Sequence, residues 1–395
     1  MKRKRNRRAR WRKHRNSDTL IPMNTEAPDA QENPRYLSEQ VITYIGNKRA
    51  LLPFIDEAVR KIRSELGGRK LSCFDAFSGS GIVSRYFKKH SSHIIANDLE
   101  LYSKIINTCY LTNRPDAEKL GLKEQYRDLT KKLAENRFIP GIISELYAPG
   151  SEDAIHRGER VFYTKRNALY LDTARTLIDE YPEEIRPFFL APLLSEASVH
   201  ANTAGVFKGF YKNRHTGIGQ FGGHKGDALN RITGNIVLEY PVFSDFEGRF
   251  QVLQEDALAA ACSVPETDLA YLDPPYNQHP YGSNYFMLNV LARNERPEKI
   301  SPISGIPSNW NRSPYNRRKD APAELRKLIE RIRAKYVLVS FNSEGFVSRE
   351  EMEEILSAEG SVETLETRYN AFRGSRNLQN RSKHVTEFLY ILKKN

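Results

Sequence analysis

Residues 270–277 read Ala-Tyr-Leu-Asp-Pro-Pro-Tyr-Asn, an apolar run that stops at a carboxylate, two prolines and an aromatic ring. Pro274 and Pro275 have a fixed φ and no amide hydrogen, so they cannot continue a central strand, and they favour extended backbone before them. Asp273 and Tyr276 are therefore expected on stiff backbone at the carboxyl edge of a strand. Open α/β sheets bind their ligands at this edge.

These residues suit a flat heterocycle that carries an exocyclic amine. The Asp273 carboxylate and the Pro274 carbonyl can accept the two N–H bonds of the amine while Tyr276 stacks on the ring. An ordinary turn after a strand is the alternative, because Asp and Pro both favour turns. The upstream sequence favours the ligand site.

A second unit with the signs of a ligand site lies at residues 71–81, Leu-Ser-Cys-Phe-Asp-Ala-Phe-Ser-Gly-Ser-Gly. It reads as a strand that breaks at a glycine turn before a helical run over 82–89, and such a turn brings backbone N–H groups close to a ligand. The next strand, 93–96, ends at Asn97 and Asp98, where a carboxylate can accept hydrogen bonds from ribose hydroxyls. The unit lacks the phosphate-binding pattern GxGxxG and a P-loop lysine, so a nucleoside without phosphates is favoured over NAD or ATP.

Hydrophobic periodicity predicts the remaining elements of an α/β sheet. A helix with apolar residues at three-to-four spacing is expected over 51–66, with Pro53 in its first turn. The other expected elements are a strand over 250–254, a helix over 321–334, a strand over 336–341, a helix near 350–357 and strands near 362–367 and 387–392. The last two strands are expected to form an antiparallel hairpin at the edge of the sheet.

In this order the motifs resemble the Dam-like alpha group of N6-adenine DNA methyltransferases, over most of residues 36–394. The matching segments are Tyr44-Ile-Gly-Asn-Lys48, Asp75-x-Phe-x-Gly-x-Gly81, Asp98, Glu255-Asp256, the Asp-Pro-Pro-Tyr motif at 273–276, Tyr281-Gly-Ser-Asn-Tyr285, 339–345 and 387–392. The resemblance implies a Rossmann-like, S-adenosylmethionine-dependent methyltransferase core with a mostly helical target-recognition insertion. It implies site-specific transfer of methyl to N6 of a flipped-out DNA adenine, in a restriction-modification system or by an orphan modification enzyme.

The resemblance also assigns roles to individual residues. The implied catalytic residues are Asp273, Pro274, Pro275 and Tyr276. The implied cofactor residues are Tyr44 and Lys48, Asp75 on the amino acid moiety, Phe77, Gly79 and Gly81 around the methionine end, Asp98 on the ribose and Asp256 on the adenine. Alternatively, the glycines cap a helix, the carboxylates bond nearby N–H groups, and Asp256 caps the helix that follows it.

Four parts are expected along the chain: a basic disordered arm and linker over 1–35, core over 36–104, a target-recognition insertion over 105–249 and core over 250–395. The front of the insertion reads helical, because Tyr170, Leu171, Ala174, Leu177, Ile178 and Tyr181 share one face, which we expect in a core. The back, over 201–225, mixes basic, aromatic and glycine residues. We expect Lys208, Lys212, Arg214 and Lys225, with Arg317 and Arg318 in the loop 301–320, to contact DNA; ordinary surface loops are the alternative.

Most of the net charge of +12 comes from the first fifteen residues, which contain ten Lys or Arg and no acid. Without them, 51 basic residues stand against 49 acidic ones. Such an arm cannot bury a core but can lie along phosphates and release counterions. A solvated tail, an import signal and an Arg-rich transit segment are the alternatives.

Composition and cysteine spacing narrow the class of protein. The three cysteines lie far apart, which fits a reducing cytoplasm and fits neither a disulfide framework nor a CxxC metal site. His200, His215 and His224 lack metal-ligand spacing, so no metal is expected. The longest apolar run, near 188–194, is too short to span a membrane, and a soluble cytoplasmic protein is expected.

The expected partner is double-stranded DNA, with a cognate restriction endonuclease as a further candidate, and the protein is expected as a monomer or weak dimer. A methyltransferase acting on RNA adenine or on cytosine N4 is an alternative, because the same pocket accepts any conjugated amine. A DNA-binding regulator without activity is the other.

Overall fold

The computed structural model describes residues 31–39, 41–135, 137–223, 226–370 and 384–395. Contacts divide the chain into Met1–Gln31 and Glu32–Asn395, and the fold below is that of the second unit. The basic residues of the predicted arm, with Lys225 and His224, lie outside the described residues.

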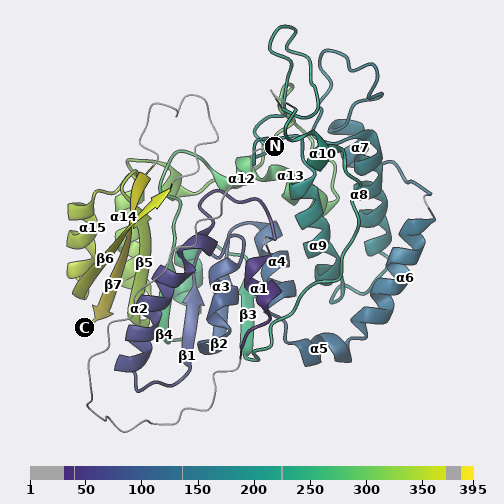
Figure 1. Cartoon of the computed structure of the whole chain (residues 1–395). Helices are drawn as coiled ribbons and strands as arrows, with labels where there is room; N and C mark the ends of the chain where they lie inside the picture. Colours follow the sequence, from purple (N-terminus) through teal and green to yellow (C-terminus); the bar gives the residue numbers. More distant parts are fainter. Residues whose placement is uncertain (1–30, 40, 136, 224–225, 371–383) are drawn as a thin grey trace, which may run out of the picture. The chain divides into compact units, whose positions relative to one another are not determined.

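A seven-stranded sheet forms within the described residues, in the order β3-β2-β1-β4-β5-β7-β6 (Figure 1). Its strands are β1 Leu71–Asp75, β2 Ser91–Asn97, β3 Arg249–Leu253, β4 Thr267–Leu272, β5 Ala334–Asn342, β6 Gly360–Asn370 and β7 His384–Lys394. The strands β1 to β5 run parallel to one another, whereas β7 is antiparallel to both β5 and β6. The expected edge hairpin is therefore confirmed, with β6 outermost.

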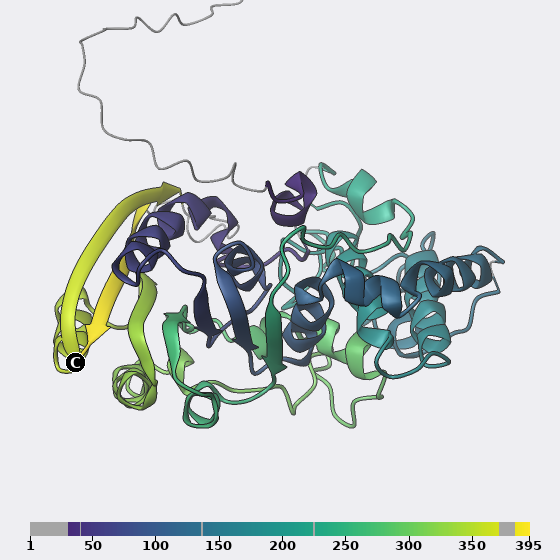
Figure 2. The same cartoon turned by 90° about the horizontal axis from the view of Figure 1, so that it is seen from below.

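Helices cover both faces of the sheet, as Figure 2 shows. On one face lie α2 Leu52–Glu65 and α3 Ile82–Phe87, and on the other lie α11 Ala257–Ser263, α14 Ala321–Arg331 and α15 Arg349–Ser357. Alternate strand residues feed the two cores because successive side chains point to opposite faces. Cys73 and Ile94 pack toward α2 and α3, whereas Phe74 and Ile95 pack toward α11, α14 and α15.

A third core belongs to a helical region beside the β3 edge. Its elements are α4 Leu101–Leu111, α5 Arg114–Lys119, α6 Leu122–Ala134, α7 Ile142–Leu146, α8 Lys165–Ile178, α9 Arg186–Val199 and α13 Phe286–Arg293. The predicted apolar face of α8 is confirmed, since Tyr170, Leu171, Ala174 and Ile178 are buried there. The expected boundary at 104/105 falls inside α4, and α13, from the second core segment, packs on α8 and α9.

One predicted boundary is wrong: the helix expected over 321–334 ends at Arg331, and Ala334 begins β5. Pairing with β4 places Ala334 in a strand, although its helical periodicity predicted a longer helix. The Thr267 amide donates to the Arg333 carbonyl at 3.0 Å, and Thr267 pairs with Ala334 across the parallel ladder. The other predicted helices and strands are confirmed to within a few residues.

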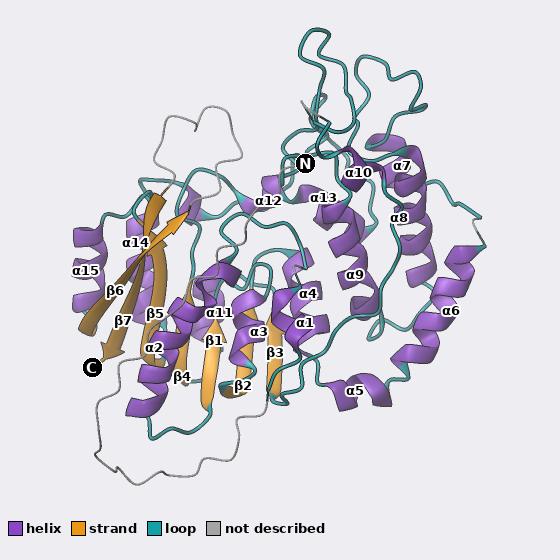
Figure 3. Cartoon of the chain, viewed as in Figure 1, coloured by secondary structure: helices purple, strands orange, loops and turns teal. Residues whose placement is uncertain are grey.

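Short elements and loops complete the described residues. These are α1 Pro34–Ser38, η1 Lys48–Leu51, α10 Leu229–Thr233, α12 Tyr281–Asn284 and η2 Pro314–Asn316. Long loops gather at the edge of the sheet toward which β1 points (Figure 3). Among the described residues, no helix is long and apolar enough to cross a membrane.

Candidate active site

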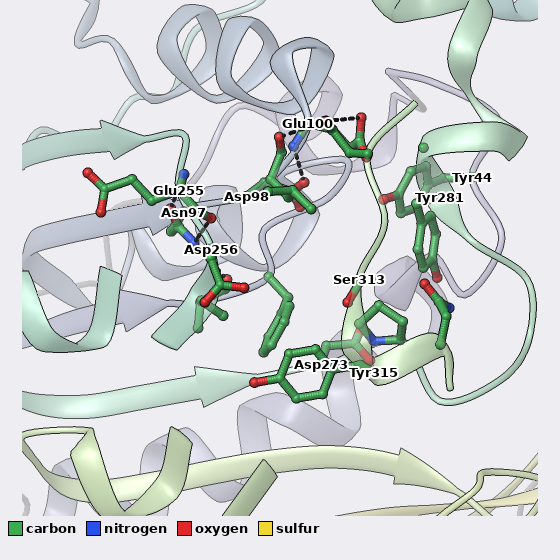
Figure 4. Close-up of a pocket in the computed structure, with 18 residues that line it drawn as sticks. Tyr44, Asn97, Asp98, Glu100, Glu255, Asp256, Asp273, Tyr281, Ser313 and Tyr315 are labelled. Carbon is green, nitrogen blue, oxygen red and sulfur yellow. Dashed lines mark hydrogen bonds between the residues drawn. The ribbon is translucent and has the colours of Figure 1, made fainter. Parts of the chain in front are cut away.

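A pocket of about 670 Å³, open to solvent, lies at the carboxyl ends of the parallel strands. Residues from the loops after β1, β2, β3 and β4 line it, together with segments 281–282 and 311–316. Figure 4 shows Glu255 and Asp256 on one side, with Tyr44 and Tyr281 on the opposite side. The pocket thus joins the segment 44–48 to the two motifs predicted to bind ligand.

Asp98 and Glu100, after β2, form the acidic end of the pocket. The Asp98 carboxylate accepts hydrogen bonds from the Gly79 and Glu100 amides, at 2.8 and 2.9 Å. Glu100 is buried and accepts from the side-chain amides of Asn289 and Asn311. Burial raises the pKa of Asp98 to about 6, and burial together with the charge of Asp98 raises that of Glu100 to about 7, although the hydrogen bonds to both carboxylates oppose these shifts.

Asp256 caps a helix, as the alternative reading expected, and it also lines the pocket, so its contact with the cofactor adenine stays a prediction. Its Oδ1 accepts from the Leu258 amide at 2.9 Å, so it caps α11, and the exposed side chain also lines the pocket. Asn97 fixes the preceding loop, because its side-chain amide donates to the Glu255 carbonyl while its Oδ1 accepts from the Glu255 amide. Capping and ligand contact are compatible, since a carboxylate has several acceptor positions.

Asp75, Gly79 and Gly81, from the glycine-containing unit 71–81, do not line the pocket themselves. Asp75 is fully buried, its Oδ2 accepts from the Ser84 hydroxyl at 2.6 Å, and burial raises its pKa to about 7. Gly81 caps α3 with φ +75°. Gly79 has φ +51°, and a Cβ there would lie 2.8 Å from the Tyr44 ring, so this position requires glycine on two counts.

Tyr44 belongs to a cluster of tyrosines beside the pocket. Its ring stacks on Tyr281 and Tyr285, with centroids 5.0 and 4.8 Å away, and meets Tyr102 edge to face. The Tyr285 hydroxyl accepts from the Ile45 amide at 2.7 Å. The segment 44–48 is therefore clamped onto α12, so its position depends on residues more than 230 positions later.

Asp273 forms an ion pair with Lys48. The Asp273 side chain is 19% exposed and that of Lys48 is 4% exposed. The Lys48 Nζ lies 2.8 Å from the Asp273 Oδ1. Nζ also donates to the Gly46 carbonyl at 3.3 Å. Burial raises the pKa of Asp273 although Lys48 opposes this, and the surrounding acids hold the pKa of Lys48 above its usual value although burial opposes this.

Tyr276 is held by the end of β5. Its ring meets Phe341 edge to face with centroids 5.9 Å apart, and its carbonyl accepts from the Phe346 amide at 2.9 Å. Pro274 is buried and Pro275 lines the pocket, and the stiffness expected of the motif from its prolines stays a prediction. The expected strand before Asp273 is confirmed as β4.

The basic residues predicted to contact DNA are exposed wherever the structure describes them. Lys208, Lys212 and Arg214 lie in one loop. The pKa of His279 is lowered mainly by burial and further by the charge of Lys208, which is therefore nearby. The loop is anchored by the Phe207 amide, which donates to the Asn284 carbonyl at 2.7 Å. Elsewhere, Arg317 pairs with Asp320 at 2.7 Å and Arg318 is exposed.

Four of the predicted cofactor residues line the pocket: Tyr44, Phe77, Asp98 and Asp256. Lys48, Asp75, Gly79 and Gly81 do not, and their roles toward a cofactor stay predictions. The sequence reasoning missed Glu100, whose only local signal is its place two residues after Asp98. Within the described residues, no group of three or more His, Cys, Asp or Glu side chains is arranged to hold a metal ion.

Comparison with known proteins identifies the family that this geometry fits. Residues 44–355 match the family model of the D12 class N6 adenine-specific DNA methyltransferases. The chain is 30% identical over 363 residues to the Type II methyltransferase M.NlaIII of Neisseria lactamica, covering 89% of this chain and 99% of that protein. It is 28% identical over 362 residues to the Type II methyltransferase M.CviAII of Paramecium bursaria Chlorella virus 1, covering 89% and 98%. It is 26% identical over 369 residues to the modification methylase StsI of Streptococcus sanguinis, covering 52% of that protein.

Proposed function

This chain belongs to the D12 class of N6 adenine-specific DNA methyltransferases, and we propose that its pocket holds S-adenosylmethionine beside an adenine flipped onto Asp273. It is a site-specific adenine DNA methyltransferase with an α/β fold, and the resemblance inferred from its motifs is confirmed. The observation that carries the proposal is the charge of the pocket lining.

The lining suits a cation and excludes phosphates. Five carboxylates line the pocket and, among the described residues, no Lys, Arg or His does so: the acids are Asp98, Glu100, Glu255, Asp256 and Asp273. S-adenosylmethionine carries a sulfonium and an ammonium, and its ribose and adenine present hydrogen-bond donors that carboxylates accept. NAD or ATP would bring phosphates against these acids, at a cost in repulsion.

Buried polar atoms point to the same ligand. Asp75 Oδ1 has no hydrogen-bond partner in the described part of the chain, and the residue directly precedes Ala76 and Phe77, which line the pocket. Such an acceptor is expensive to bury unless something donates to it. We assign Asp75 to the amino acid end of the cofactor, Asp98 to its ribose and Asp256 to its adenine.

When bound, S-adenosylmethionine supplies the methyl group that the target amine accepts. Asp273 and the Pro274 carbonyl hold that amine and favour the geometry in which the N6 lone pair is no longer delocalised into the ring. Because Lys48 takes Oδ1, Oδ2 is left for the amine. Tyr276 supports the base, which must leave the helix because N6 is not reachable in stacked DNA.

The exposed basic residues around the site fit a DNA backbone. We assign Lys208, Lys212, Arg214, Arg317 and Arg318, which are exposed, to contact with DNA phosphates. Two of the relatives above are named as Type II methyltransferases, so we propose that the chain modifies DNA in a restriction-modification system, with an orphan modification enzyme as the alternative. We place it in the cytoplasm, as a monomer or weak dimer.

Mapping methylated bases tests the proposed function. The protein, duplex DNA and S-adenosylmethionine are incubated, and the products are sequenced with methylated adenine and cytosine distinguished. N6-methyladenine within one short sequence is expected. Methyl at cytosine N4, or methyl in RNA but not in duplex DNA, would overturn the substrate assignment, and binding without transfer would indicate a regulator.

A further inference from the structure

Lys48 is paired with one buried acid and also feels the charge of a second, although one acid would neutralise it. The first is Asp273, at 2.8 Å. The second is Glu387 of β7, 6% exposed, whose charge acts on both Lys48 and Asp273. Glu387 lies outside residues 44–355, the range of the family match.

Strand register brings Glu387 to the reaction edge. β7 runs antiparallel to β5, so the start of β7 meets the carboxyl end of β5, and Glu387 pairs with Asn342. The Asn342 side chain lies near the Glu387 carboxylate and the Tyr276 hydroxyl, and its amide opposes the rise in the pKa of both groups that burial causes. Its Oδ1 accepts from the Glu344 amide at 3.0 Å, which fixes the direction of the amide. The network therefore reaches both ends of the Asp-Pro-Pro-Tyr motif.

This second carboxylate is held at a cost. Burial raises the pKa of Glu387 to about 7, more than the nearby ammonium of Lys48 lowers it. The titratable groups that face it are Lys48, Asp273 and Tyr276. A glutamine would present an acceptor oxygen to Asn342 with less desolvation, so packing and polar contact alone do not explain the acid.

We propose that Glu387 is a positioning residue for methyl transfer: its charge shares the Lys48 ammonium, so that Asp273 stays a strong acceptor for the target amine. If Lys48 were paired with Asp273 alone, its ammonium would weaken Asp273 more strongly as an acceptor for the amine. With Glu387 ionised, the cluster of two acids and one base carries net negative charge, which favours an amine that becomes positive as it gains methyl. The inference rests on the proposed function.

Glu387→Gln tests the charge while it keeps shape and hydrogen bonding. The expected result is a fall in kcat of about tenfold at pH above the Glu387 pKa, the size of one pKa unit of lost interaction. Affinity for S-adenosylmethionine, measured by calorimetry, stays unchanged because Glu387 does not line the pocket. The control is Glu363→Gln on β6, an exposed glutamate of the same hairpin, with wild-type kcat expected.

A pH series separates positioning from a structural role. Glu387 is mostly protonated at about pH 6 and mostly ionised at about pH 8, either side of its pKa of about 7. The ratio of wild-type to Glu387→Gln kcat should rise from near unity to about tenfold across this window, whereas the titration of Asp273 is common to both enzymes. Melting temperature at the higher pH should be equal or higher for Glu387→Gln, since the raised pKa means that ionisation of Glu387 destabilises the fold.

Wild-type kcat in Glu387→Gln across the series would overturn the proposal, as would a constant ratio accompanied by a lower melting temperature. Wild-type protein that transfers no methyl to adenine would instead refute the proposed function. The two failures are therefore read from different arms of one experiment.

Discussion

Both ends of the pocket contain carboxylates, but these carboxylates have different kinds of partner. At the β2 end, Asp98 and Glu100 accept hydrogen bonds from uncharged amides of the backbone and of Asn289 and Asn311. At the β4 end, Asp273 is paired with the ammonium of Lys48. The acids of one end are therefore hydrogen-bonded by neutral groups, whereas the acid of the other end has a paired cation.

This difference matches the two ligands that the pocket is proposed to hold. A cationic cofactor supplies the positive charge that the β2 end lacks. The amine of adenine is neutral and needs an acceptor, so a carboxylate there must be held ionised by the protein itself. An acid that lacks a paired cation is suited to a cationic ligand, and an acid that has one is suited to a neutral ligand.

Removing the acid at the β4 end should have the largest effect. Asp273→Ala is expected to lower methyl transfer by at least about a hundredfold, as for other preorganised groups, while S-adenosylmethionine still binds. Asp273→Asn should also be severely impaired, because the amide is uncharged and can present a donor to the amine. Methyl incorporation into duplex DNA and calorimetry with cofactor measure both. Near-normal turnover by Asp273→Ala would end the assignment of the acceptor.

Removing an acid at the β2 end should instead affect the cofactor. Asp98→Ala is expected to weaken binding of S-adenosylmethionine by about 1–3 kcal/mol, through loss of a charged acceptor. Calorimetry measures the dissociation constant, and Asp153→Asn, an exposed acid outside the pocket lining, is the control. An unchanged affinity with the fold intact would exclude Asp98 from the cofactor site.

The ring at the β4 end should act by stacking. Tyr276→Ala is expected to weaken capture of the flipped base by about 1–3 kcal/mol, whereas Tyr276→Phe should be milder because a phenyl ring still stacks. The phenylalanine variant also loses the polar contact of the hydroxyl with Asn342, so a small loss is expected. Kinetics on duplex DNA compare the two. Equal defects would argue that the hydroxyl, and not the ring, is what matters.

The smallest expected effect concerns stability without cofactor. The pKa of Glu100 is raised from 4.5 to about 7, so the fold loses stability as pH rises between these values, because the glutamate must ionise while buried. Glu100→Gln should therefore raise the melting temperature of the free protein at about pH 8, by a few degrees at most, and weaken cofactor binding. Calorimetric scans with and without S-adenosylmethionine measure this. A lower melting temperature in the free variant would show that Glu100 is structural.

The sequence was sufficient to place the acids of the site but not to pair them. Asp98, Asp256 and Asp273 each follow a strand, and carboxyl ends of parallel strands meet at one edge. The Lys48–Asp273 pair joins positions 225 residues apart, and its partner choice follows from how the segment 44–48 packs on α12. The sequence does not predict a role for Glu100, because its amide partners come from α13 and from the loop 301–320. Such pairings depend on tertiary packing, which periodicity does not report.

Order of synthesis gives the position of β7 a further meaning. β7 follows the six other strands in sequence, yet it lies between β5 and β6 and carries Glu387. Lys48 and Asp273 are synthesised well before this strand. The nascent chain therefore contains its recognisable motifs while the strand between β5 and β6 is still missing. We expect a gene interrupted just before residue 384 to yield a polypeptide that retains every signature motif through 339–345 and leaves the host genome unmarked.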